Sequence, residues 1–181
     1  MVKYLILFLF VTVLSACYRD SMISIQGKGI KNPDIQLRMD GYYYYRYPEG
    51  HFNEGITVVW FLYTNGVLMN PFGTKTNELP SIDQKINEIY SSSKYESVKY
   101  DWGAFTLDKE KLEIEKWAVP LFPGPTRSIE YTGTVLNEEQ FVLTEYRNPD
   151  TGEREKVNKT YTFREFSPKP DSTNQFIKGL E

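Results

Sequence analysis

The sequence predicts an all-β fold, an eight-stranded antiparallel meander barrel with one short helix between the third and fourth strands. Short runs of aromatic and β-branched residues recur through the chain, and turn-forming residues separate them. Most of these connections are too short for a parallel crossover, so successive strands are expected to pair antiparallel. A meander of eight strands leaves two open edges unless it closes into a barrel. A β-sandwich of two sheets shares these local signals and stays open as the alternative.

Composition excludes several classes of protein. The 181 residues contain one Cys and one His, which leaves no internal disulfide, no cysteine zinc cluster and no histidine-rich metal site. Lys and Arg number 21 against 24 Asp and Glu, so bulk electrostatics do not favour nucleic acid. The sequence therefore predicts one domain with no cofactor and no metal ligands.

The first 17 residues read MVKYLILFLFVTVLSAC, with Lys3 followed by an apolar run and then small residues. This layout is typical of a signal peptide and is too short for a permanent membrane span. Its end, Leu14 to Cys17, resembles the bacterial lipobox, which implies cleavage between Ala16 and Cys17 and attachment of a diacylglycerol to the Cys17 thiol. An ordinary signal peptide with a chance cysteine is the alternative.

The lipobox resemblance also implies a location. In Gram-negative lipoproteins an Asp directly after the cysteine favours the inner membrane, and this chain has Tyr18 there. We therefore expect a palmitate-type anchor in the outer membrane. No acidic cluster follows Cys17, which favours the periplasmic side over the cell surface.

The domain boundaries follow from composition. Residues 1–16 form the signal peptide, 17–38 a lipidated tether, 39–166 the barrel and 167–181 a polar, loosely docked tail. Asn65-Gly66 between two apolar runs predicts a hairpin. The expected strands are Gly41–Tyr47, Ile56–Tyr63, Val67–Phe72, Val98–Leu107, Lys111–Val119, Arg127–Leu136, Gln140–Tyr146 and Val157–Phe166.

One segment has helical spacing. Ser81 to Gln84 has the S-x-x-Q form of a capping box, and apolar side chains recur at helical spacing at Ile82, Ile86, Ile89 and Tyr90. The pattern predicts a helix of about three turns that ends near Ser91–Ser93. Its narrow apolar stripe predicts that the helix lies on the surface of the domain.

Alternation predicts which side chains point into the barrel. The inward set is Tyr100, Trp102, Leu112, Ile114, Ile129, Tyr131, Phe141, Leu143, Tyr161 and Phe163. Six of these are candidate ligand-lining or core residues: Trp102, Ile114, Tyr131, Phe141, Tyr161 and Phe163. With 14 Tyr, 11 Phe and 3 Trp, either an aromatic pocket or an aromatic core fits the composition.

The chain resembles the small lipocalin-like lipoproteins of Bacteroidetes, whose function is unknown. The resemblance lies in the lipobox, Gly41 to Tyr45, Asn65-Gly66, and Asp101 to Thr106. It implies a barrel that can hold one small ligand, and it implies no particular ligand. The first strand departs from the family pattern, because Gly41-Tyr42-Tyr43 stands where lipocalins carry Gly-x-Trp.

The sequence contains no recognisable catalytic set. His51 lies in a predicted turn, where it is expected to be solvated, and no nucleophile motif is present. Leu121 and Phe122 lie in a proline-rich loop, as candidates for a barrel mouth or a partner surface.

Two functional hypotheses remain. In the first, the protein is a non-enzymatic lipoprotein that binds a small hydrophobic or aromatic ligand in the cell envelope. In the second, its barrel is solid and docks an envelope protein.

Overall fold

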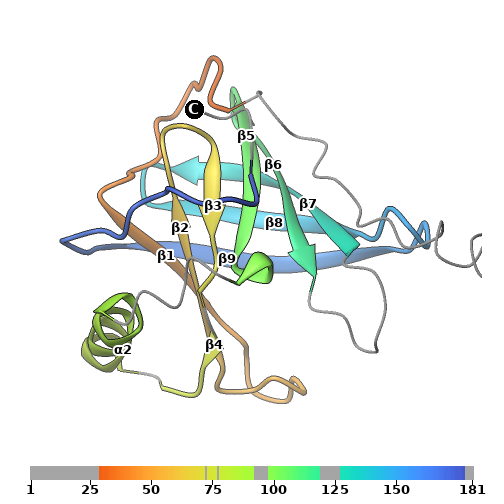
Figure 1. Ribbon diagram of the computed structural model, residues 1–181. Coiled ribbons are helices and arrows are strands. Elements are labelled where there is room, and N and C mark those ends of the chain that lie inside the picture. Colours follow the sequence, from red (N-terminus) through yellow and green to blue (C-terminus); the bar gives the residue numbers. More distant parts are fainter. Residues whose placement is uncertain (1–28, 72, 77, 92–97, 119–126, 178–181) are drawn as a thin grey trace, which may run out of the picture.

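A computed structural model describes residues 29–71, 73–76, 78–91, 98–118 and 127–177 (Figure 1). They form nine strands, one α-helix and one 3-10 helix, η2 (Lys99–Asp101). The helix is α2 (Leu79–Ser91), and the strands are β1 (Gly41–Arg46), β2 (Thr57–Leu62), β3 (Val67–Met69), β4 (Gly73–Thr74), β5 (Trp102–Asp108), β6 (Lys111–Ala118), β7 (Arg127–Asn137), β8 (Gln140–Arg147) and β9 (Arg154–Glu165).

The strands close into an antiparallel barrel. The order runs β1-β9-β8-β7-β6-β5-β3-β2, and β1 also pairs with β2, which joins the two ends of the sheet. A strand has two edges, so β3 and β4 share the edge of β2 that β1 leaves free. The barrel therefore has eight strand positions. The eight-stranded prediction is confirmed, and the sandwich alternative is wrong.

The predicted Asn65-Gly66 hairpin joins β2 to β3. The Tyr63 amide donates to the Val67 carbonyl at 3.0 Å, and Gly66 takes the left-handed backbone (φ 83°) that this turn requires. Shorter, two-residue turns join β5 to β6 and β7 to β8. Successive strands are thus antiparallel neighbours, as expected for a meander.

Two separate apolar clusters hold the fold. One fills the barrel, and every one of the eight barrel strands contributes to it. Its buried members are Leu37, Tyr43, Trp60, Leu62, Leu68, Phe105, Leu107, Leu112, Ile114, Val135, Phe141, Leu143, Tyr161 and Phe163. The other lies on the outer face of β1, β2, β3, β5 and β6, where α2 and the C-terminal segment cover it.

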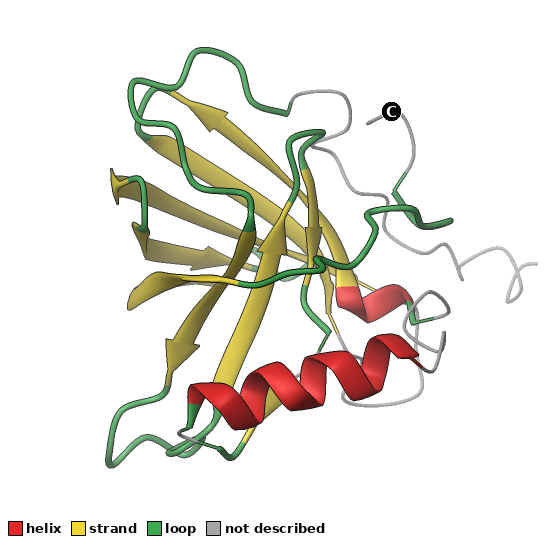
Figure 2. Cartoon of the chain, turned by 90° about the vertical axis from the view of Figure 1, so that its left-hand side faces the viewer, coloured by secondary structure: helices red, strands yellow, loops and turns green. Residues whose placement is uncertain are grey.

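The helix α2 lies outside the barrel, as Figures 1 and 2 show. Ile82 and Ile86 are fully buried against the outer face, which confirms the predicted surface position. Asp83 binds the Arg164 guanidinium on β9 with oxygen–nitrogen distances of 2.5 to 3.2 Å. It also accepts a hydrogen bond from the Tyr42 hydroxyl at 2.8 Å.

The predicted capping box is wrong. The helix begins at Leu79, so Ser81 and Gln84 lie inside it, and the Ser81 hydroxyl donates to Glu78 at 3.4 Å. Pro80 fits the first turn because its missing N–H would have no partner there.

Both ends of the domain extend beyond the predicted limits. Ile30, Ile35 and Leu37 pack into the interior cluster, so the described part of the expected tether belongs to the barrel. At the other end, Phe176 and Ile177 pack on the outer cluster, and the Lys169 ammonium donates to the Met39 and Leu62 carbonyls at 2.6 and 2.5 Å. The tail is therefore docked more firmly than its polar composition predicts (Figure 1).

Candidate functional site

The arginine end of the barrel is defined by Arg38, Asp40, Glu139 and Glu165. Arg38 binds the three carboxylates at 2.6, 3.1 and 3.1 Å, and its guanidinium lies 4.4 Å from the centre of the Phe163 ring. These hydrogen bonds raise the pKa of Arg38 and lower that of Asp40. The chain before β1 crosses this end of the barrel and places Leu37 in the interior.

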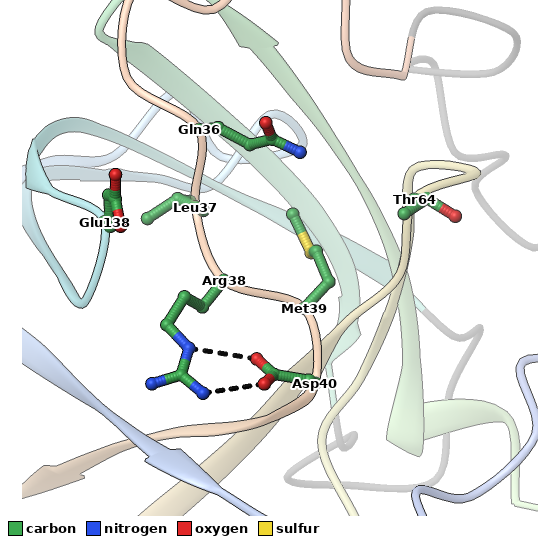
Figure 3. A pocket seen from close by; sticks show the side chains of 7 residues that line it. All are labelled: Gln36, Leu37, Arg38, Met39, Asp40, Thr64 and Glu138. Atoms are coloured by element: carbon green, nitrogen blue, oxygen red, sulfur yellow. Dashed lines mark hydrogen bonds and ion pairs between the residues drawn. The ribbon is translucent and has the colours of Figure 1, made fainter.

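A pocket of about 430 Å³ lies beside Arg38 (Figure 3). Its walls are the chain before β1, Thr64 of the β2–β3 turn and Glu138 of the β7–β8 turn. Because three carboxylates already bind Arg38, this pocket offers an anion no free cation at Arg38. The pocket is a surface hollow that leads to a neutralised ion cluster.

Aromatic rings fill the middle of the barrel. Trp60 stacks on Tyr161 at 4.4 Å between ring centres, and Tyr161 stacks on Phe141 at 4.9 Å. Tyr43 contacts Phe141 and Phe163 at 5.1 and 5.3 Å. This half of the interior is a packed core.

The opposite end differs in chemistry. We define the lysine end by Asp101, Lys116, Tyr131, Tyr146 and Lys159. Lys116 follows Leu112 and Ile114 on the inward face of β6 and pairs with Ile129 on β7 and Gly103 on β5. A Cβ at position 103 would lie 2.7 Å from the Lys116 Cβ, so the close approach of β5 and β6 requires glycine at position 103.

Lys116 is partly buried and lacks a close partner. Its interactions with charged groups are electrostatic attraction to Asp101 and repulsion from Lys159, and no hydrogen bond from any part of the chain that the structure describes reaches its ammonium. Burial lowers its pKa from 10.5 to about 8, and burial raises the pKa of Asp101 from 3.8 to about 6. An ammonium group needs acceptors, which leaves water or a ligand to supply them.

Lys159 lies on the inward face of β9, two residues before Tyr161. Its ammonium is 5.6 Å from the centre of the Tyr131 ring and 5.4 Å from that of Tyr47. Tyr131 also contacts Tyr146 at 5.6 Å and Trp60 at 5.9 Å. The lysine end therefore joins two ammonium groups to a wall of tyrosine rings that is continuous with the packed core.

A row of aromatic rings connects the solvent with this region. Phe52 is 90 % exposed and stacks on His51 at 4.5 Å, and His51 stacks on Tyr47 at 4.4 Å. Tyr45 then links Tyr47 to the interior residue Tyr161 at 5.1 and 5.6 Å. His51 accepts a hydrogen bond from the Asn53 amide through Nδ1 at 3.0 Å, as befits a residue of the turn.

The predicted inward residues divide into two groups. Ile114, Tyr131, Phe141, Tyr161 and Phe163 belong to the interior cluster, as expected. The predicted inward orientation of Trp102 is wrong, because Trp102 is buried in the outer cluster. The predicted inward orientation of Tyr100 is wrong for the same reason, since Tyr100 packs against that cluster. The six positions Trp102 to Leu107 of β5 are all buried, so both faces of the strand are covered and alternation could not tell them apart.

Sequence reasoning missed Asp101, Lys116, Lys159 and Trp60 as interior residues. Lys116 has the same parity as Leu112 and Ile114, so alternation along β6 could have identified it. Trp60 gave no such signal, since β2 is apolar on both faces.

Several predictions concern residues that the structure does not describe: the cleavage and lipid-attachment site at Ala16 and Cys17, and the loop residues Leu121 and Phe122. Across the described ranges, no helix is long and apolar enough to cross a bilayer. Those same ranges contain no cluster of three or more histidine, cysteine or acidic residues suited to a metal ion.

Comparison with known proteins gives no relative: no protein-family description, no curated protein and no solved structure matches this chain.

Proposed function

We propose that this protein is a non-enzymatic, lipid-anchored binding protein of the cell envelope, and that the lysine end of its barrel holds a small ligand with a hydrophobic or aromatic body. One observation carries the proposal. Lys116 projects toward an interior lined mainly by apolar and tyrosine side chains, together with Lys159 and Asp101, and no described residue forms a hydrogen bond with the Lys116 ammonium.

The cost of that arrangement favours a binding role. A partly buried ammonium without a hydrogen-bond partner from the protein costs stability, so a barrel with only a structural role gains nothing from Lys116. The rings of Tyr47 and Tyr131 lie beside the neighbouring Lys159 ammonium, and Tyr146 contacts Tyr131. Apolar rings next to a cation are typical of sites that orient an amphipathic ligand.

Native mass spectrometry of the full chain, purified gently from its own host, tests the binding role. We expect a small-molecule adduct that is lost on denaturation. Ile129 faces Lys116 across the β6–β7 ladder, so Ile129→Trp should abolish the adduct by filling the site. Thr160→Trp, on the exposed outer face of β9, should retain it. An adduct that survives Ile129→Trp contradicts the proposed location.

Lipid anchoring is a separate part of the proposal and rests on the Leu14 to Cys17 motif. Cells grown with labelled palmitate should incorporate the label into the chain, and Cys17→Ser should not acquire it. An outer-membrane position predicts that the labelled protein fractionates with outer-membrane markers. Label on the Cys17→Ser protein would contradict the assignment of the anchor.

The second hypothesis, a solid barrel that docks an envelope protein, also has an observation in its favour. The rings of Trp60, Tyr161, Phe141 and Tyr43 pack the middle of the barrel, and Phe52 is exposed at its rim. A bare chain mass from every gentle preparation, together with loss of a cross-linked partner in Phe52→Ser, would favour this function over ligand binding.

A further inference from the structure

We infer that the ligand carries an anionic group, a carboxylate or a phosphate, that Lys116 binds directly and Lys159 attracts, with an aromatic or apolar body against the tyrosine rings. The inference rests on the proposed function, because it specifies the chemistry of the ligand at that same site.

The position of the two lysines is the first step. They come from β6 and β9, on the inward faces defined by Ile114 and Tyr161. Tyr131 lies between them, because it pairs with Ile114, two residues before Lys116, on the adjacent strand. The Tyr131 ring lies 5.6 Å from the Lys159 ammonium. An anion at the lysine end would therefore meet two cations from different strands.

The second step is the balance of charge. Asp101 is the partly buried carboxylate that attracts Lys116, and Glu155 is an exposed carboxylate near Tyr131 and Tyr146 at the rim. Among described residues, neither carboxylate forms an ion pair with Lys116 or Lys159 within 4 Å. Inside the barrel, two ammonium groups thus face one partly buried carboxylate, because Glu153 and Glu155 are exposed to solvent at the rim. The positive charge of the two lysines is therefore incompletely balanced within the interior, where a ligand anion would bind.

The contrast with the arginine end is the third step. Arg38 has three bound carboxylates, and each oxygen–nitrogen distance is 3.1 Å or less. The fold therefore neutralises the arginine at one rim of the barrel with its own carboxylates and leaves the two lysines at the other end without bound carboxylates. A ligand anion would complete the lysine end in the way that the carboxylates complete the arginine end.

The nature of the body follows from the rings. Tyr47 and Tyr131 face the Lys159 ammonium, Tyr146 contacts Tyr131, and Trp60 contacts Tyr131 on the side of the core. Flat apolar groups pack well between such rings. A small naphthalene-sized acid therefore makes a suitable probe.

The experiment compares three probes that share one ring system: 2-naphthoate, 2-naphthyl phosphate and the neutral 2-naphthamide. The full chain, washed free of co-purified molecules as checked by native mass spectrometry, is held in nanodiscs, and calorimetry measures each affinity. Empty nanodiscs correct for partition into lipid. Comparison of 2-naphthoate with 2-naphthyl phosphate shows whether the site prefers a carboxylate or a phosphate.

The variants are Lys116→Met and Lys159→Met, each with a control on the outer face of the same strand. Lys111→Met serves β6, where Lys111 is exposed and paired with Glu113, and Lys156→Met serves β9, where Lys156 is exposed. We expect at least one anion to bind more tightly than naphthamide. Lys116→Met should weaken that anion by about tenfold or more, with a smaller loss in Lys159→Met. Naphthamide binding and both control variants should stay within about twofold of the original chain.

The outcomes separate the two proposals. Equal affinity for anion and amide, unchanged by Lys116→Met, overturns the anion inference and leaves the barrel as a binding site. If Lys111→Met or Lys156→Met weakens anion binding as much as Lys116→Met does, the anion binds at the protein surface. That result overturns the inference too. A chain that binds no probe and yields no native adduct overturns the proposed function, and the inference with it.

Discussion

Gly103 on β5 lies directly opposite Lys116 on β6, and a Cβ at position 103 would come 2.7 Å from the Lys116 Cβ and 2.6 Å from the Glu115 carbonyl oxygen. The two strands therefore approach so closely here that position 103 requires glycine. Alternation along β6, in which Lys116 shares the face of Leu112 and Ile114, places the lysine on the inward face at the end of the barrel opposite Arg38.

Gly103→Ala should destabilise the fold. The added methyl group meets backbone and a Cβ, neither of which can move as the end of a flexible chain could, so we expect a loss of about 1 to 3 kcal/mol in the free energy of unfolding. Urea unfolding followed by tryptophan fluorescence measures it. Thr160→Ala on the exposed face of β9 is the control and should stay within about 0.5 kcal/mol of the original. A neutral effect of Gly103→Ala would show that the two strands lie further apart.

Lys116→Met should stabilise the protein while it weakens binding of the anion. At neutral pH the folded state contains a partly buried charge without close partners, and replacement by an apolar chain of similar length removes that cost, about 1 to 3 kcal/mol. Urea unfolding at pH 7 measures the gain, with Lys111→Met as the matched exposed control. A large loss of stability in Lys116→Met would assign the lysine a structural role.

The same gain should depend on pH. Lys116 has a pKa of about 8 when folded, below the 10.5 expected for the unfolded chain. Below pH 8 Lys116 is charged in both the folded and the unfolded protein, so the folded state bears the full free-energy cost of the partly buried charge. Between pH 8 and 10.5 the unfolded chain binds the extra proton, so the stability of the original protein rises toward that of the variant. The difference between the two proteins in unfolding experiments should therefore shrink as pH rises through this window. If the stability difference between the two proteins instead grows from pH 8 to 10.5, the pKa of Lys116 is raised by folding and not lowered.

Asp83→Ala should loosen α2 from the barrel. The carboxylate binds both the Arg164 guanidinium and the Tyr42 hydroxyl, and its removal leaves two partly buried donors without their acceptor. We expect a loss of about 1 to 2 kcal/mol, reduced by partial exposure of the pair, and faster amide exchange in α2. Glu88→Ala, which removes an exposed hydrogen bond with Gln84, is the control and should leave amide exchange in α2 nearly unchanged. Unaltered exchange in Asp83→Ala would mean that Ile82 and Ile86 hold the helix without this ion pair.

Lys169→Met should release the C-terminal segment. Its ammonium donates to the Met39 and Leu62 carbonyls and lies 4.1 Å from the centre of the Tyr63 ring, so the variant leaves two carbonyls without a donor. We expect a loss of about 1 to 3 kcal/mol and earlier protease cleavage within residues 167–177. Lys156→Met supplies the exposed control. Cleavage at the original rate would show that Phe176 and Ile177 suffice to dock the segment.

Particular residues show how far sequence reasoning reached. Strands with one polar face were assigned correctly, because Leu112 and Ile114 alternate with Glu113 and Glu115 and only one register buries the apolar pair. The orientation of Trp102 was predicted wrongly because β5 is buried on both faces, so its sequence pattern does not indicate which face points inward. The same applies to Trp60 on β2, the central ring of the interior stack.

The sequence by itself determined the all-β class, the order of the strands as a meander, the single helix and the hairpin at Asn65-Gly66, because these features depend on local periodicity and turn chemistry. Only the tertiary structure decided which face of β2 and β5 points inward, that residues 29–40 close one end of the barrel, and that Lys116 and Lys159 share the other. Those features depend on barrel closure and on what covers its outer face, and both bring together residues far apart in the chain.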